Sequence, residues 1–222
     1  MNTTKNSSQQ QGSHWFVGLV VLLLMSACGS KSTTRSWVEH GFIHTEQGPY
    51  IIKGICYHPV PAGDTLRSFD RIQEDLELMQ SAGINTIRVY EPIASKSVLD
   101  AIDAAGLKVI VGFGYDQGGV YDIKSGTFVD YVRRFKSHPA ILLWELGNEY
   151  NYHPEWFEGD IDVWYTALSN AADAIHQEDA NHPVATAHGE VPTDDLLAQL
   201  DNVDVWGLNV YRWDVSYTAR KD

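Results

Sequence analysis

The segment LLWELGNEY, residues 142–150, places two carboxylates and a carboxamide in and just after an apolar run. An ionised carboxylate in apolar surroundings costs free energy unless it is paired or used in chemistry. Glu145, Asn148 and Glu149 therefore predict a core strand that ends in functional groups. The chemistry that carboxylates offer at such a position is general acid and base catalysis.

Side-chain alternation predicts how these residues point. Successive side chains of a strand face opposite sides of the sheet. Trp144 and Asn148 are then expected on one face and Glu145 on the other. Glu149 follows the point where the strand passes into a loop, so alternation no longer fixes its direction and it can point into the mouth of a site.

The surrounding chain alternates between helical and strand patterns from residue 42 onward. Apolar residues recur at helical spacing in residues 69–82, with Ser68 as the expected N-cap and Gly83 just past the end. Further helices are predicted at residues 97–105, 128–135, 161–175 and 194–200. A hairpin precedes the first buried strand, and the six predicted strands are IKGICYHP, INTIRVY, LKVIVGF, AILLWEL, PVATA and VDVWGLNV.

The order of these elements predicts a parallel α/β fold. The junctions SAGINTIRV and AAGLKVIVG nearly repeat, each with a helix, a glycine stop and a buried strand. Continuous apolar strands are typical of parallel sheets covered by helices. No glycine-rich phosphate loop follows the first strand, which argues against a dinucleotide-binding fold. We expect a (β/α)8 TIM barrel with about six of its eight βα units present and its chemistry at the carboxyl ends of the strands.

Polar, charged and aromatic residues gather at every predicted strand end, whereas the strand bodies are rich in Val, Ile and Leu. A polar ring with aromatic walls suits a sugar, because hydroxyls need hydrogen bonds and the apolar faces of the ring need stacking surfaces. The residues at these ends are Tyr57, His58, Arg88, Tyr90, Glu91, Tyr115, Asp116, Asn148, Glu149, His188, Glu190, Asn209, Tyr211 and Trp213.

Four of the strands resemble those of a known group of enzymes. HPAILLWELGNE resembles the fourth-strand motif of the retaining glycoside hydrolases of clan A, closest to the family 2 barrel domains with some likeness to family 5. IKGICYHP, GINTIRVY and VDVWGLNVY resemble the first, second and sixth strands of these enzymes. The similarity covers about residues 40–213, and four matching strands in the right order are far more specific than the Gly-Asn-Glu element alone.

The resemblance implies catalytic roles for three residues. Glu149 would be the general acid/base, which protonates the leaving oxygen and then activates water. Asn148 would hydrogen-bond the sugar 2-hydroxyl, and Arg88 would orient the nucleophilic carboxylate. Glu145 lies about 13 Å from Glu149 at the rise of a strand, whereas retaining chemistry places its two carboxyl groups about 5–5.5 Å apart. We therefore expect Glu145 to be a structural residue, ion-paired between the barrel and its helices.

The same resemblance implies the remaining contacts with substrate. His58 would line the glycone subsite, Tyr211 would approach the nucleophile, and Trp213 would form a stacking wall. The expected substrate is a β-linked polysaccharide or oligosaccharide, which is hydrolysed or transferred through a glycosyl-enzyme intermediate. No cofactor is expected.

The family pattern also requires a nucleophilic glutamate at the end of a seventh strand. The chain ends shortly after the predicted sixth strand, so we expect a fragment that is poorly stable and nearly inactive. If the chain is complete, the second carboxylate must be Glu91, Asp116 or Glu190. The alternative hypothesis is a lipoprotein that binds glycans without turnover through a degenerate barrel.

A metal-dependent barrel hydrolase is a third hypothesis. The chain has nine histidines, but no pair has a ligand spacing such as His-Glu-x-x-His, so no metal site is expected. The net charge of −13 argues against a nucleic-acid partner, because the phosphate backbone attracts basic surfaces.

The first residues resemble a bacterial lipoprotein signal. WFVGLVVLLLM, residues 15–25, is an apolar run too short for an ordinary transmembrane helix. It leads to MSAC, so residues 1–27 are expected to be a signal peptide and Cys28 the lipidated residue that holds the protein to a membrane. Gly29 follows the cysteine in place of Asp, which implies the outer membrane of a bacterial cell envelope.

The expected domain organisation follows from this signal. Residues 28–40 are predicted to be a tether, and residues 41–222 a partial TIM-barrel catalytic domain. With Cys28 lipidated, Cys56 has no disulfide partner and is expected to be a small buried residue.

Overall fold

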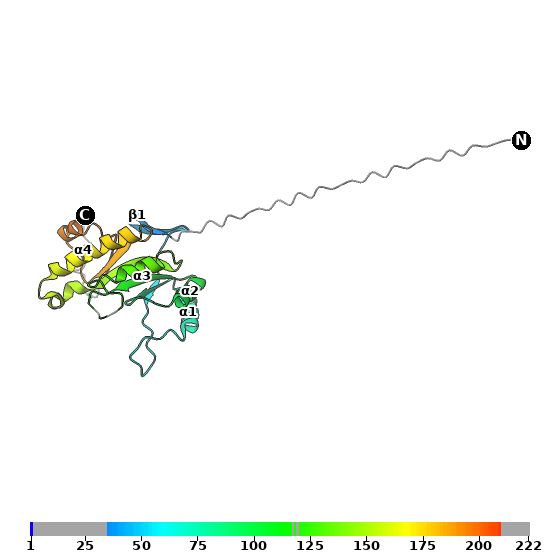
Figure 1. The fold of residues 1–222 in the computed structure, drawn as a ribbon, viewed down its shortest axis with the longest axis horizontal. Helices are drawn as coiled ribbons and strands as arrows, with labels where there is room; N and C mark the ends of the chain where they lie inside the picture. The colour runs from blue at the N-terminus through cyan, green and yellow to red at the C-terminus, as the bar shows by residue number, and fades with distance from the viewer. Residues whose placement is uncertain (2–34, 117, 119, 210–222) are drawn as a thin grey trace. The chain divides into compact units, whose positions relative to one another are not determined.

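A curled sheet of six parallel strands forms the centre of the computed structural model, which describes residues 1, 35–116, 118 and 120–209 (Figure 1). Neighbouring strands of this sheet follow one another in the chain, in the order β4-β5-β6-β7-β8-β9. Each adjacent pair is parallel. The strands are β4 (Gly54–Cys56), β5 (Thr86–Val89), β6 (Lys108–Phe113), β7 (Ile141–Asn148), β8 (Val184–His188) and β9 (Val205–Leu208).

A helix connects each strand of this sheet to the next. The helices are α1 (Ile72–Ser81), α2 (Lys96–Ala104), α3 (Phe128–Phe135), α4 (Ile161–Glu178) and α5 (Asp194–Gln199), and two 3₁₀ turns, Tyr150–Tyr152 and Pro154–Phe157, precede α4. Strand and helix alternate as the sequence predicts, so the expectation of a partial (β/α)8 barrel with six strands is confirmed. In the described residues α3 and α4 lie side by side, where Arg133 forms a 3.0 Å ion pair with Glu178 (Figure 1).

The start of α1 differs from its prediction. Ser68 does not cap the helix, because α1 begins at Ile72 with Arg71 in the N-cap position. The Ser68 hydroxyl instead accepts a hydrogen bond from the backbone N–H of Asp70 at 3.2 Å. A short turn therefore separates the serine from the helix, and periodicity locates the helix more accurately than the capping residue does.

The apolar residues of the strands fill two cores. The larger core lies between the sheet and the helices and contains Ile87, Val111, Trp144, Tyr131 and Trp164. A smaller cluster on the opposite face of the sheet consists of Ile110, Leu142, Leu143 and Ala185, with Ile43 and Tyr50 packed against it. Both faces of β7 are therefore buried, which explains the continuous apolar run in its sequence.

A small antiparallel sheet packs at the amino ends of the parallel strands. It consists of β1 (Ser36–Glu39), β2 (Phe42–Thr45) and β3 (Gly48–Pro49). The Tyr50 hydroxyl donates to the backbone carbonyl of Asn85 at 2.8 Å, just before β5 begins. The prediction of a tether as far as residue 40 is therefore wrong for residues 36–39, because these residues pair with β2.

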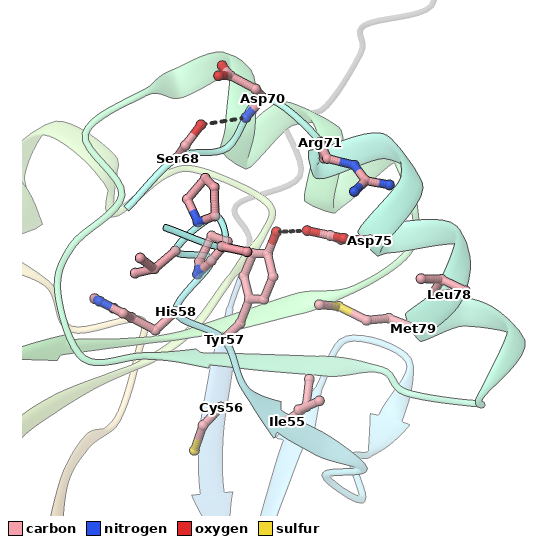
Figure 2. A pocket seen from close by; sticks show the side chains of 14 residues that line it. Ile55, Cys56, Tyr57, His58, Ser68, Asp70, Arg71, Asp75, Leu78 and Met79 are labelled. Atoms are coloured by element: carbon pink, nitrogen blue, oxygen red, sulfur yellow. Dashed lines mark hydrogen bonds between the residues drawn. The ribbon is translucent and has the colours of Figure 1, made fainter. Parts of the chain in front are cut away.

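The first parallel strand is less buried than its sequence predicts. Gly54, Ile55 and Cys56 of β4 are all exposed, so the predictions of a buried first strand and a buried Cys56 are wrong. Among the described residues β4 pairs with β5 alone, which leaves it at an edge of the sheet. Figure 2 shows the pocket of about 780 Å³ that lies between this edge and α1.

The predicted lipoprotein signal, including Cys28, lies outside the described residues. Within the part of the chain that the structure describes, no helix combines the length and the apolar character needed to cross a membrane. The signal and the lipid anchor stay predictions.

Candidate active site

Three polar side chains meet at the carboxyl ends of β5 and β7. Arg88 Nε lies 2.9 Å from both carboxylate oxygens of Glu145, and Arg88 Nη2 lies 2.6 Å from Glu145 Oε1. The same Nη2 donates to Asn148 Oδ1 at 2.8 Å. We call Arg88, Glu145 and Asn148 the site-side cluster. A guanidinium fork that bonds both oxygens of a carboxylate is among the strongest side-chain pairings in proteins.

The expectation that Glu145 and Asn148 face opposite sides of the sheet is wrong. On β8, two residue steps lead from Ala185 to Ala187, whereas on β7 three steps lead from their partners Glu145 to Asn148. The extra residue is a β-bulge, which reverses the alternation and turns both side chains to the same face. The expected ion pair of Glu145 is confirmed, but it lies on the face away from the helices.

Gly147 makes this bulge possible. Its φ of +71° lies in the left-handed region that favours glycine. A Cβ atom at this position would lie 2.6 Å from Cζ2 of Trp164, which reaches the strand from α4. Both the backbone conformation and the packing against Trp164 therefore require glycine at position 147. The bulge at this glycine sets the direction of Asn148 and Glu149.

The guanidinium of Arg88 is held on every side. Its Nη1 lies 3.6 Å from Cys56 Sγ, and its centre lies 4.7 Å from the centroid of the Tyr90 ring. Burial lowers the pKa of Arg88, but the hydrogen bond and charge of Glu145 raise it by more, so the guanidinium stays protonated. Burial raises the pKa of Glu145 above its ordinary value, although the hydrogen bonds from Arg88 act in the opposite direction.

Glu149 has an unusual backbone conformation and an unused side-chain oxygen. Its φ is +55°, which is rare for a residue with a side chain and is associated with functional sites. Its backbone N–H donates to the carbonyl of Ala187 at 2.8 Å, which ties the strained residue to β8. Within the described residues its Oε1 is buried and has no hydrogen-bond partner. Buried polar atoms in proteins are normally paired, so this oxygen is suited to a partner that arrives from outside.

A cavity with aromatic walls includes Tyr150, the residue after Glu149, in its lining. It measures about 430 Å³, and its lining residues are Tyr115, Asp116, Tyr150, Trp156 and Phe157. The Trp156 side chain is 55% exposed, and one face of its ring stacks on His153 at 3.9 Å between centroids. Aromatic surfaces combined with a carboxylate acceptor are what a sugar ring requires.

His188 ends β8 in a buried environment. Its Nδ1 lies 2.6 Å from the backbone carbonyl of Glu190, and its Nε2 lies 3.5 Å from the Tyr165 hydroxyl. Burial lowers the pKa of His188, while the carbonyl of Glu190 opposes that shift. The histidine is therefore neutral near pH 7 and serves as a hydrogen-bonding group.

The other predicted site residues lie apart from the site-side cluster or outside the described residues. His58 is exposed and lines the open pocket beside α1, where Figure 2 also shows the hydroxyl of Tyr57 bonded to Asp75. Its assignment to a glycone subsite stays a prediction. Tyr211 and Trp213 fall outside the described residues, so their roles stay predictions too.

The three carboxylates named as alternative partners of Glu149 each have a neighbour of their own. Glu91 lies 3.7 Å from Arg67, and Asp116 forms a 2.5 Å ion pair with Lys124. Glu190 Oε1 accepts a hydrogen bond from the Tyr152 hydroxyl at 2.9 Å. Across residues 35–209, apart from the gaps at 117 and 119, the structure groups no three His, Cys, Asp or Glu side chains in a way that could hold a metal ion.

Sequence reasoning missed Cys56 and Tyr90 as neighbours of the Arg88 side chain. The spacing of residues in the sequence could not predict the contact of Cys56 with Arg88, because it depends on the register of β4 against β5, which pairs these two residues directly. The position of Tyr90 at a strand end was the available signal for its place at the site.

The chain is similar to a family of enzymes and to several of its members. A family model described as glycosyl hydrolases family 2, TIM barrel domain, matches residues 38–213. A β-glucuronidase from Bacteroides fragilis is 28% identical over 153 residues, which are 63% of this chain and 21% of that protein. A β-glucuronidase from Formosa agariphila is 34% identical over 89 residues, which are 38% of this chain and 9% of that protein.

A solved structure shares the fold. The crystal structure of a glycosyl hydrolase family 2 member from Bacteroides cellulosilyticus gives a TM-score of 0.63 at 22% identity, and the match covers 79% of this chain and 24% of that chain. The chain thus spans less than a quarter of the length of each of these three proteins.

Proposed function

This chain belongs to glycosyl hydrolase family 2 through its TIM barrel domain, and on that premise we propose that it acts in the cleavage of O-glycosidic bonds in a β-linked polysaccharide or oligosaccharide. The proposed mechanism is a retaining double displacement, in which Glu149 is the general acid/base and a glutamate expected at the end of a seventh strand is the nucleophile that forms the glycosyl-enzyme intermediate. Hydrolysis and transglycosylation share the same glycosyl-enzyme intermediate, and water or a second sugar would complete the reaction.

The environment of Glu149 is the observation that supports this proposal most strongly. A general acid must reach the leaving oxygen, and its carboxyl group must not be committed to another partner. Glu149 follows the last residue of β7, its Oε1 is buried and unpaired among the described residues, and its backbone is strained. Strain of this kind costs about 1–3 kcal/mol and persists where the surrounding structure fixes it.

The neighbouring residues are suited to holding a sugar in front of Glu149. Asn148 is proposed to hydrogen-bond the 2-hydroxyl, with its carboxamide fixed by Arg88. The aromatic cavity that Tyr150 and Trp156 line is proposed to offer a surface for a second sugar ring. His58, Tyr211 and Trp213 are proposed as further substrate contacts.

The names of the relatives suggest which substrate to test first. Two of them are β-glucuronidases, so 4-nitrophenyl β-D-glucuronide is the first compound to offer, followed by the corresponding galactoside, glucoside and mannoside. The configuration of the first sugar released, followed by proton NMR, tests retention directly.

The decisive experiment compares the full chain with its Glu149→Gln variant on the best of these substrates. Loss of general acid/base catalysis is expected to lower kcat/KM by about 10²–10⁴-fold. The melting temperature is expected to stay unchanged, because Glu149 Oε1 makes no hydrogen bond within the described residues. Equal rates for both proteins would remove the acid/base assignment.

The leaving group gives a second and independent readout. A 2,4-dinitrophenyl glycoside needs little protonation to leave, so Glu149→Gln should slow bond cleavage in it much less than in a 4-nitrophenyl or methyl glycoside. A chain that binds glycans with either side chain at position 149, yet cleaves none of them, would favour the alternative of a glycan-binding lipoprotein.

We also propose that Cys28 carries lipid and anchors the protein in a bacterial outer membrane. The support is the sequence pattern alone, an apolar run followed by MSAC. Mass spectrometry of the amino-terminal peptide from the membrane fraction tests this proposal. An unmodified Cys28 in that peptide would contradict it.

A further inference from the structure

Glu145 lies in the site but has no role in the proposed reaction. It is 5% exposed, and it sits on the same face of β7 as Asn148 because of the bulge at Gly147. Both of its carboxylate oxygens accept hydrogen bonds from Arg88. A buried ion pair of this kind contributes little net stability compared with a well-packed apolar pair, so stability alone is a weak reason for its presence.

The geometry of the guanidinium shows what the pair does. Arg88 Nη2 bonds Glu145 Oε1 and Asn148 Oδ1 at the same time, at 2.6 and 2.8 Å. The guanidinium is planar and rigid, so fixing Nε and Nη2 on Glu145 also fixes the direction from which Asn148 receives its hydrogen bond. Arg88 therefore fixes the position of the Asn148 side chain relative to Glu145.

The orientation of Asn148 follows from that hydrogen bond. A carboxamide presents its oxygen and its nitrogen on opposite sides. Because Oδ1 faces Arg88, Nδ2 faces the other way and remains a donor for a ligand. Without the bond from Arg88, the amide could rotate and present its oxygen instead, which is unable to donate to a sugar oxygen.

We infer that Glu145 is a positioning residue, which holds Arg88 so that Asn148 presents its Nδ2 donor to the 2-oxygen of the sugar. This inference rests on the proposed function and adds a residue to it. It also limits how Arg88 could orient a nucleophile, because Nε and Nη2 are already bonded to Glu145 and Asn148 and Nη1 is the nitrogen left for that task.

The kinetic test uses Glu145→Gln and two substrates that differ only at carbon 2. With the 2-hydroxy glycoside, kcat/KM is expected to fall about 10- to 100-fold, because hydrogen bonds to the 2-hydroxyl strengthen in the transition state of glycoside cleavage. With the matching 2-deoxy glycoside, which lacks the oxygen that Asn148 would contact, the variant is expected to differ from the unchanged protein by less than about 3-fold. An equal loss on both substrates would show a general structural effect and overturn the inference.

A control variant separates this effect from the loss of any paired carboxylate. Glu178 is also a paired carboxylate, bonded to Arg133 and Lys136, but it lies at the end of α4 against α3 and away from Arg88. Glu178→Gln is expected to leave the rates on both substrates unchanged. If Glu145→Gln fails to fold, Glu145→Asp retains the charge but draws the carboxylate back from Arg88, and it is expected to show the same dependence on the 2-hydroxyl.

A readout that needs no activity keeps the inference separate from the proposed function. In ¹⁵N-labelled protein without ligand, Glu145→Gln should shift the Asn148 side-chain amide signal and the Arg88 Nε–H signal, whereas Glu178→Gln should shift neither. If the unchanged protein neither cleaves nor binds any of these glycosides, the proposed function fails, yet these shifts would still support the positioning role. Unchanged Asn148 and Arg88 signals in Glu145→Gln would overturn that role whatever the activity.

Discussion

Trp144 and Glu145 are neighbours on β7, yet they belong to two different buried polar clusters. Glu145 joins Arg88 and Asn148 in the site-side cluster. Trp144 points to the helices, where its Nε1 donates to Asp179 Oδ2 at 2.8 Å, and His182 Nδ1 lies 2.7 Å from the same oxygen. We call Trp144, Asp179 and His182 the helix-side cluster. A buried carboxylate is therefore hydrogen-bonded on each face of β7: Glu145 on one face and Asp179, the acceptor for Trp144, on the other.

The two clusters differ in what remains available to a ligand. The helix-side cluster is closed, since the side chains of Asp179 and His182 are both fully buried. Burial raises the pKa of Asp179, but the hydrogen bond and charge of His182 lower it by more, and the net effect is a pKa below the ordinary value. The site-side cluster ends in Asn148, which is half-buried and has a donor left over. Similar bonding thus stabilises the fold on one face and orients a substrate contact on the other.

The two clusters also extend toward opposite ends of the parallel strands. Asp179 and His182 lie between the end of α4 and the start of β8, at the amino end of the sheet. Arg88 and Asn148 lie toward the carboxyl ends of their strands. In barrels of this architecture the amino end serves stability and the carboxyl end serves chemistry.

The largest expected effect comes from breaking the helix-side cluster with Asp179→Ala. The substitution leaves the buried donors of Trp144 and His182 without an acceptor, and the free energy of unfolding should fall by about 3–5 kcal/mol. Urea unfolding measures this change. The catalytic rate of the molecules that remain folded should stay the same, since the site-side cluster is untouched.

A surface aspartate provides the control for that prediction. Asp130 pairs with Arg133 on the exposed face of α3, where the Asp130 side chain is 68% exposed. Asp130→Ala should change the stability by less than about 1 kcal/mol, as is usual for exposed ion pairs. Equal losses in the two variants would remove the distinction between a closed cluster and the surface.

Gly147→Ala tests the bulge that brings Asn148 to the same face of β7 as Glu145. Its Cβ would lie 2.6 Å from Trp164, and the residue would have to adopt a left-handed backbone. Overpacking and strain together should lower the free energy of unfolding by about 2–4 kcal/mol. Unlike Asp179→Ala, this variant should also lose activity in its folded molecules, because the directions of Asn148 and Glu149 depend on the bulge.

A matched glycine sharpens this comparison. Gly106 also has a left-handed φ, +73°, but a Cβ there would meet no atom within 4 Å. Gly106→Ala should therefore show the backbone strain alone, with a smaller loss of stability and normal activity. Normal activity in folded Gly147→Ala would mean that the bulge does not direct the site.

Much of this fold was predictable because each element buries an apolar stripe whose period can be read locally. The helix predicted at residues 128–135 has the same bounds as α3, and its apolar stripe is buried: Phe128, Tyr131, Val132 and Phe135. The alternation of six strands with five helices follows from the same kind of local pattern. Glu149, Asn148 and Arg88 were singled out because strand ends in a parallel fold meet at one edge, and the structure does bring Arg88 into contact with Asn148.

The errors arose where the structure depends on distant residues. The side of the sheet that Glu145 faces is set by the register of β7 against β8 and by Trp164 on α4, neither of which alternation along β7 can indicate. The partner of Glu145 is 57 residues away on β5. The exposure of Cys56 likewise depends on which strands flank β4 and not on the apolar residues around it.

The smallest expected effect concerns His188, a buried histidine at the site end of β8. Its pKa is lowered by burial, so below the ordinary histidine pKa of about 6.5 the unfolded chain takes up a proton before the folded protein does. The free energy of unfolding should therefore decrease as the pH falls from about 6.5 toward the lowered pKa, by at most about 1.4 kcal/mol per pH unit, and no further loss from this group should follow below it. Urea unfolding at pH 7.5 and 5.5 should show a smaller decrease for His188→Gln than for the unchanged protein. His153→Gln, with a side chain that is 38% exposed, is the control and should retain the full decrease. Equal pH dependence in all three proteins would show that protonation of His188 does not affect the stability of the fold.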